Sequence, residues 1–148
     1  MEVFTSSELV LPYTASSVGE ARRRLIGDLA VAGIYEPGAS DVALVLSELI
    51  SNALRHATPL PGFTFRVCWR LLDDSVEVAV SDGGAETVPT IHKPTGWAIG
   101  GRGLGIVDRL SLRWGVSDED GMTTVWAQLP ARQDSSERVV AGSRVPAG

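Results

Sequence analysis

The feature that most constrains the fold is a pair of alternating segments separated by two acidic residues. Apolar residues take every second position over 63–71, between Thr, Arg and Cys, and valines do the same over 76–80. A period of two is typical of a β-strand with one buried face. Asp73-Asp74 supplies suitable turn residues between the two segments. The sequence therefore predicts a β-hairpin that turns one face toward a core.

Two amphipathic helices are predicted before this hairpin. Apolar residues recur at helical spacing over 17–32, where Ser17 and Glu20 match the pattern of a capping box. A second helix is expected from Ser40-Asp41 to about Ala57. Its expected buried side consists of Val42, Val45, Leu46, Leu49 and Ala53.

The remaining elements complete an α+β pattern. A short strand is expected over 8–11, a third helix directly after a glycine-rich turn, and two last strands around 114–117 and 123–129. Because helices do not alternate regularly with strands, a doubly wound parallel sheet is disfavoured. We expect a two-layer α/β sandwich over 1–130, with a mostly antiparallel sheet and helices on one face. The polar, aperiodic segment 131–148 is expected to be a disordered tail.

The composition excludes some classes of protein. The chain of 148 residues carries a net charge of −5, which argues against a general affinity for nucleic acid. Its basic run, Arg22-Arg23-Arg24, is expected to form a solvated helix face. The single Cys68 excludes an intrachain disulfide, and no signal peptide or membrane-spanning apolar run is found. We therefore expect a cytoplasmic protein that binds neither nucleic acid nor membrane directly.

The second helix carries the first candidate group. Glu48 and Asn52 lie one turn apart, about 6 Å along the axis, on the side predicted to be opposite the apolar stripe, near Arg55 or His56. The amide oxygen of Asn52 can then reach a magnesium ion while the Glu48 carboxylate reaches a water or hydroxyl. Alone, this segment favours an ordinary amphipathic helix with a solvated face.

Two glycine-containing turns follow. Asp82 ends a valine-rich strand before Gly83-Gly84, where its carboxylate can accept a hydrogen bond from an adenine amino group. The run from Gly100 to Gly105 precedes a helix, and backbone N–H groups there suit phosphate. It is neither a dinucleotide fingerprint, because Ile106 replaces the third glycine, nor a Walker loop. Taken singly, the segment after Asp82 favours an ordinary Asp-Gly turn. The glycine run also fits a flexible connector.

In this order and spacing, the segments resemble the GHKL (Bergerat-fold) ATP-binding family. Glu48-x-x-x-Asn52 resembles its N box, Asp82-x-Gly84 its G1 box, and Gly101-x-Gly103-x-Gly105 its G2 box. Thr123 or Thr124 resembles the threonine that helps to hold the adenine-binding aspartate. The resemblance covers about residues 8–130. It points to the branch of bacterial anti-sigma factor serine/threonine kinases and related short ATP-binding regulators of actinobacteria.

The resemblance implies a Bergerat ATP-binding fold with ATP and Mg²⁺ as cofactors. It implies that Glu48 is the general base, that Asn52 binds Mg²⁺ and that Asp82 binds adenine. It also implies a lid over 85–100, with Lys93 or Arg102 as candidates to contact the γ-phosphate. The other cofactor-binding residues that it implies are Gly84, Gly101, Arg102, Gly103, Leu104, Gly105 and Thr123.

Two functions are compatible with this resemblance. The first is a regulator that sequesters a sigma factor and phosphorylates a serine or threonine of an anti-anti-sigma partner of the STAS type, as favoured by Glu48. The second is an ATP-binding interaction switch without phosphotransfer. It is favoured because Glu86 replaces the second glycine of the G1 box and the usual lid arginine is not matched. A histidine-kinase catalytic domain is disfavoured. The sequence leaves open whether the protein forms a homodimer.

Overall fold

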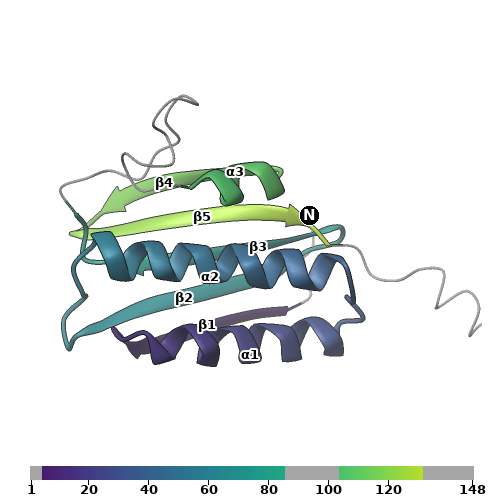
Figure 1. The fold of residues 1–148 in the computed structure, drawn as a ribbon, viewed down its shortest axis with the longest axis horizontal. Helices are drawn as coiled ribbons and strands as arrows, with labels where there is room; N and C mark the ends of the chain where they lie inside the picture. The colour runs from purple at the N-terminus through teal and green to yellow at the C-terminus, as the bar shows by residue number, and fades with distance from the viewer. Residues whose placement is uncertain (1–4, 86–103, 132–148) are drawn as a thin grey trace, which may run out of the picture.

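The computed structural model describes residues 5–85 and 104–131. Within them, an antiparallel sheet of five strands in the order β1-β2-β3-β5-β4 is covered on one face by helices (Figure 1). This confirms the α+β fold that the sequence predicts. The elements are β1 (Thr5–Pro12), α1 (Ser16–Val31), α2 (Gly38–His56), β2 (Thr64–Leu71), β3 (Ser75–Asp82), α3 (Gly105–Leu110), β4 (Arg113–Glu119) and β5 (Met122–Pro130).

The predicted hairpin forms the middle of the sheet, and its apolar face is the floor of the core. In β2 the buried positions alternate with more exposed ones, as the sequence pattern predicts. The predicted apolar stripe of α2 is also confirmed, because each of its five members is at most 2% exposed. Each large side chain buried in this seam contributes about 1.5–3 kcal/mol. The seam therefore holds α2 against the sheet, above β3 and β5.

A partly buried carboxylate joins α1 to the edge of the sheet. The Asp28 carboxylate accepts hydrogen bonds from Ser7 Oγ at 2.7 Å and from Trp69 Nε1 at 2.8 Å. Ser7 lies in the edge strand β1 and Trp69, which is 1% exposed, in its neighbour β2. One oxygen of Asp28 thus links three elements, and it satisfies the polar atom of a buried indole.

Several boundary predictions are wrong. Ser17 does not cap α1: its hydroxyl donates to Pro12 O at 2.7 Å, and the N-cap is Ala15. The end of β1 therefore uses the hydroxyl that the capping box would need. Helix α2 begins at Gly38 rather than at Ser40, since Pro37 serves as its N-cap. Ala131, predicted to open the tail, is 3% exposed and belongs to the core; residues 132–148 lie outside the described ranges.

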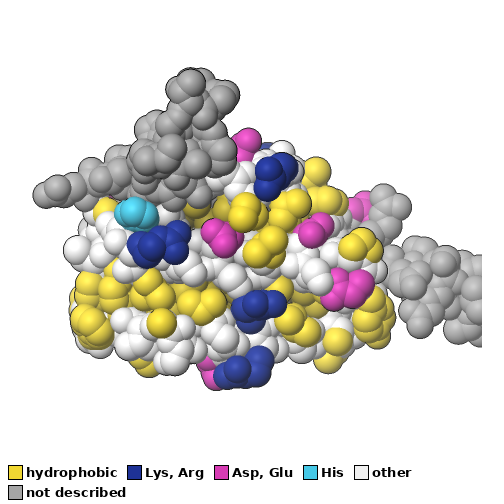
Figure 2. Space-filling view, in the orientation of Figure 1, with side chains coloured by type: hydrophobic (Ala, Val, Ile, Leu, Met, Phe, Trp, Pro, Cys, Tyr) yellow, Lys and Arg dark blue, Asp and Glu magenta, His cyan; other side chains and the backbone are white. Residues whose placement is uncertain are grey.

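The helix-covered face carries charges of both signs among apolar side chains (Figure 2). The basic run in α1 is exposed, as predicted. Glu20 lies 3.1 Å from Arg23 and 3.6 Å from Arg24. Exposed pairs of this kind contribute about 0–1 kcal/mol, so the run is a solvated helix face. In the described part of the chain, no helix is long and apolar enough to cross a membrane.

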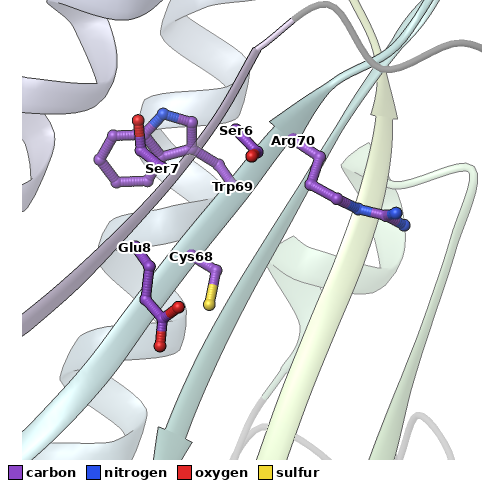
Figure 3. Close-up of a pocket in the computed structure, with 6 residues that line it drawn as sticks. All are labelled: Ser6, Ser7, Glu8, Cys68, Trp69 and Arg70. Carbon is purple, nitrogen blue, oxygen red and sulfur yellow. The ribbon is translucent and has the colours of Figure 1, made fainter.

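The opposite face of the sheet carries the more polar positions of the strands. Figure 3 shows Glu8 and Cys68 side by side there, at a hollow of about 370 Å³ between β1 and β2. Burial raises the pKa of the Cys68 thiol, the Glu8 carboxylate raises it further, and the Arg66 guanidinium opposes the shift. The thiol is therefore protonated near neutral pH, which fits a small packed residue better than a reactive one.

Replacement of Asp28 tests the link between α1 and the sheet. Asp28→Ala is expected to lower the free energy of unfolding by about 2 kcal/mol, because a buried indole N–H loses a charged acceptor. Urea denaturation measures the change. Asp73→Ala, in the exposed turn of the hairpin, is the matched control and should change stability by less than about 0.5 kcal/mol. Equal stability of the two variants would show that Asp28 does not hold α1 in place.

Candidate functional site

The candidate site lies where the segment after α2 meets the turn after β3. Thr58 N–H donates to Gly84 O at 2.9 Å, and Gly83 N–H donates to Thr58 O at 2.8 Å. The Thr58 hydroxyl donates to the same Gly84 carbonyl at 2.9 Å. These three hydrogen bonds bring the ends of α2 and β3 together. The sequence motifs that end these two elements therefore share one end of the domain.

Each of the two glycines of this turn is required for a different physical reason. At Gly83, a Cβ atom would lie 2.5 Å from Pro59 O, which is closer than real Cβ atoms come to backbone. Gly84 has φ +94°, in the region that residues with a Cβ rarely adopt. The sequence places both glycines in the turn after Asp82. The structure shows that the first one is needed for the contact with the segment after α2.

Asp82 is a buried carboxylate, 1% exposed, at the last position of β3. One of its oxygens, Oδ1, accepts the Gly84 N–H at 2.7 Å. Thr123 of β5 pairs with Asp82 across the sheet. A Cβ atom on Gly84 would lie 3.4 Å from Thr123 Oγ1. Asp82, Gly84 and Thr123, three of the predicted site residues, therefore meet at one point.

The alternative threonine occupies a different place. Thr124 Oγ1 lies 2.6 Å from Ser81 Oγ, and both residues alternate in direction with the Asp82–Thr123 pair. Their side chains consequently point to the face of the sheet opposite to that of Asp82 and Thr123. Of the two threonines considered from the sequence, only Thr123 shares a sheet face with Asp82.

The predicted position of Asn52 on α2 is wrong in one respect. It was expected on a polar side opposite the apolar stripe, yet it is 1% exposed, as buried as Leu49 at 2%. The buried arc of α2 is wider than the predicted stripe because the sheet and α3 both pack against this helix. Glu48 is partly buried, whereas Arg55 and His56 are exposed. A buried amide at this position requires polar surroundings, in contrast to a solvated helix face.

The last group of predicted residues is only partly described. Leu104 is the N-cap of α3 and is 1% exposed, and Gly105 is the first residue of that helix. Helix α3 packs against α2. Gly101, Arg102 and Gly103 lie outside the described residues, as do Lys93 and the predicted lid apart from Ala85.

The donor set of the described residues fits a purine nucleotide with a hard cation. A buried carboxylate beside two glycines can accept a hydrogen bond from an amino group. Because the carboxylate is buried, water competes little for this hydrogen bond. An amide oxygen and a carboxylate one helical turn apart are oxygen ligands of the kind that Mg²⁺ prefers. The described part of the site therefore contains suitable groups for both cofactors expected from the sequence.

Two residues at this end of the domain were missed by the sequence reasoning. One is Thr58, described above. The other is Tyr13, whose hydroxyl lies 2.7 Å from the carbonyl oxygens of both Ala53 and Ala57 at the end of α2. Both contacts join segments far apart in the chain, so no local pattern marks them.

Several known proteins are similar to this chain in sequence or in fold. The model of the histidine kinase-like ATPase domain family matches residues 11–129. The serine-protein kinase RsbW of Staphylococcus epidermidis is 29% identical over 79 residues, which cover 52% of this chain and 50% of that kinase. The match thus spans about half the length of this kinase.

A solved structure shows the same fold. The RsbU and RsbW domains of Rv1364c from Mycobacterium tuberculosis match with a TM-score of 0.63 at 21% identity. This match covers 88% of the present chain and 34% of the other. The arrangement of the antiparallel sheet and its helices is therefore shared with a solved protein.

Addition of one methyl group at Gly83 tests the contact that assembles the site. Gly83→Ala is expected to lower the free energy of unfolding by about 1–3 kcal/mol, since the backbone near Pro59 must move. Gly27→Ala is the control, because its added Cβ meets nothing within 4 Å in the middle of α1; it should gain about 0.5–1 kcal/mol. Chemical denaturation compares them. A Gly83→Ala protein as stable as the parent would contradict the close approach.

Proposed function

Because this chain belongs to the histidine kinase-like ATPase domain family, we propose that it binds ATP and Mg²⁺ at the joined ends of α2 and β3. One observation carries the proposal. The buried Asp82 carboxylate lies beside Gly84 and Thr123, at the point where Thr58 ties this turn to the end of α2. ATPase domains bind ATP, and this is the place in the described chain where the expected recognition groups meet.

The adenine end of the nucleotide is assigned to Asp82. Its carboxylate accepts a hydrogen bond from the exocyclic amine of the base, while Gly84 N–H orients it through Oδ1. Burial makes the interaction selective, because an amino group satisfies the carboxylate and a carbonyl oxygen at the same place repels it. Thr123 lines the same place from the adjacent strand.

The phosphate end is assigned to α2 and the segment that enters α3. The amide oxygen of Asn52 would hold Mg²⁺, and the glycine-rich motif that ends at Gly105 is assigned to the phosphates. When bound, Mg²⁺ neutralises charge on the phosphate oxygens. Glu48, one helical turn or about 6 Å from Asn52, accepts the proton of the attacking hydroxyl. The hydroxyl oxygen then bonds the γ-phosphorus as ADP leaves.

The biological role follows from the similarity to serine-protein kinases. We propose that the chain phosphorylates a serine or threonine of an anti-anti-sigma partner of the STAS type and sequesters a sigma factor. The 29% identity to RsbW supports this choice, and Glu48 is the residue type that the transfer needs. Because the chain matches about half of that kinase, phosphate transfer and the binding of partners each need an experiment of their own.

Binding of ATP is the primary test. Calorimetry on the purified chain is expected to show ATP binding that requires Mg²⁺. Asn52→Ala should weaken Mg²⁺-dependent binding by more than about tenfold, since the metal loses a ligand. Asn52→Asp keeps an oxygen at this place and should retain Mg²⁺ dependence, which separates loss of the ligand from damage to the core. Unchanged affinity in a folded Asn52→Ala protein would exclude this metal site.

Transfer is tested separately at Glu48. Glu48→Gln is expected to bind ATP like the parent and to lose at least about 100-fold in the rate of phosphorylation, because the base is absent. The measurement follows labelled phosphate from ATP to a purified anti-anti-sigma protein, with Glu20→Gln on the charged face of α1 as control. Equal rates for both variants would refute the assignment of the base. ATP binding by a parent protein that transfers no phosphate would favour the non-catalytic switch.

A further inference from the structure

The backbone of Gly84 is hydrogen-bonded on both sides of its Cα atom. Its N–H donates to Asp82 Oδ1 at 2.7 Å. Its carbonyl accepts two hydrogen bonds from Thr58, one from the backbone N–H and one from the hydroxyl, both at 2.9 Å. The N–H and the carbonyl of Gly84 belong to two consecutive peptide units that meet at the Gly84 Cα atom. The Asp82 carboxylate is therefore coupled to Thr58 through the backbone of Gly84.

The hydroxyl bond is not needed to satisfy a buried group. Thr58 is exposed, and the Gly84 carbonyl already accepts the Thr58 N–H. Loss of the hydroxyl would leave no orphaned donor or acceptor in the core, so its effect on stability should be small. What the second bond adds is a restraint on the direction of the carbonyl.

Such a restraint matters at this position because side-chain packing supplies none. Gly83 and Gly84 carry no side chains, and Gly84 has φ +94°. Two consecutive glycines give the chain more conformational freedom than other residues do. The nearest atom to a Cβ built on Gly84 is Thr123 Oγ1, at 3.4 Å. The hydroxyl of Thr58 adds a side-chain restraint to the two backbone hydrogen bonds that already hold the turn.

We infer that Thr58 is a positioning residue of the nucleotide site: its hydroxyl fixes the Gly84 carbonyl, restrains the backbone of this glycine and thereby aims the Asp82 carboxylate at the base. This inference rests on the proposed function for the identity of the ligand. It adds a residue outside the three sequence motifs, and it assigns that residue to base selectivity. Thr58 acts through Gly84 and Asp82 and does not itself contact the nucleotide.

A positioning role and a structural role predict different results. If Thr58 only stabilised the loop, its loss would weaken all nucleotides alike and lower the melting temperature. If it aims Asp82, its loss weakens ATP, which has an amino group on the base, more than ITP, which has a carbonyl oxygen there. The ratio of the affinities for ATP and ITP therefore measures how well Asp82 is oriented toward the base. The melting temperature measures how much Thr58 stabilises the loop.

The experiment compares Thr58→Val, which keeps the shape and the backbone bonds, with Thr58→Ser, which keeps the hydroxyl. For Thr58→Val, the affinity for ATP and the ratio of the two affinities should fall about three- to tenfold, the range of one net hydrogen bond. Thr58→Ser should restore both. Thr14→Val removes another exposed hydroxyl, bonded only locally to Ser16, and should change neither. Calorimetry provides the affinities in the presence of Mg²⁺.

Amide hydrogen exchange at Gly84 provides a readout without nucleotide. Exchange of the Gly84 N–H should be faster in Thr58→Val than in the parent and normal in Thr58→Ser. An unchanged rate, or an equal loss of ATP and ITP affinity, would overturn the inference. Failure of the parent protein to bind ATP would instead overturn the proposed function. The exchange rate would then still decide whether the Thr58 hydroxyl holds the turn.

Discussion

The backbone contact between Thr58-Pro59 and Gly83-Gly84 is the constraint on which the site depends. A helix end and a strand end meet there with less space than a single methyl group requires, because a Cβ at Gly83 would lie 2.5 Å from Pro59 O. The hydrogen bonds that accompany the approach place the turn after β3 directly beside the segment that leaves α2. The two halves of the proposed nucleotide site belong to separate elements, and this contact brings them together.

The apolar seam between α2 and the sheet determines what this contact can position. Because α2 is covered by β3, β5 and α3, its buried arc includes Asn52 as well as the leucines and valines. One side of the helix therefore contributes to the core and to the proposed metal site at once. Tyr13 adds to this arrangement, since its hydroxyl lies within 2.7 Å of two carbonyl oxygens at the end of α2.

The proposed function assigns the two ends of the nucleotide to different elements of the fold. Recognition of the base is assigned to a strand end, and handling of the phosphates to a helix and to the segment that enters α3. The similarity to a serine-protein kinase over 52% of the chain and the match of the ATPase family model over residues 11–129 support an ATP-dependent role. We assign the control of base selectivity to Thr58, a residue that belongs to none of the three motifs.

The fold followed closely from local patterns. The alternation over β2 and β3 and the stripe on α2 reflect the periods of two and 3.6 residues that any half-buried strand or helix must have. The errors arose where contacts between distant segments decide the surroundings of a side chain. Ser17 matched a capping box, but its hydroxyl bonds to Pro12, and Asn52 looked solvated because a helical pattern does not show how many elements cover the helix.

Sequence alone determined the order of elements, the antiparallel hairpin and the residue types of the three motifs, because these depend on neighbours along the chain. Tertiary structure alone decided that Thr123 rather than Thr124 shares a face with Asp82, that Asn52 is buried, and that Thr58 bonds to Gly84. These are relations between residues far apart in sequence. They depend on strand register and on the approach of two backbones. Neither of these produces a periodic pattern in the sequence.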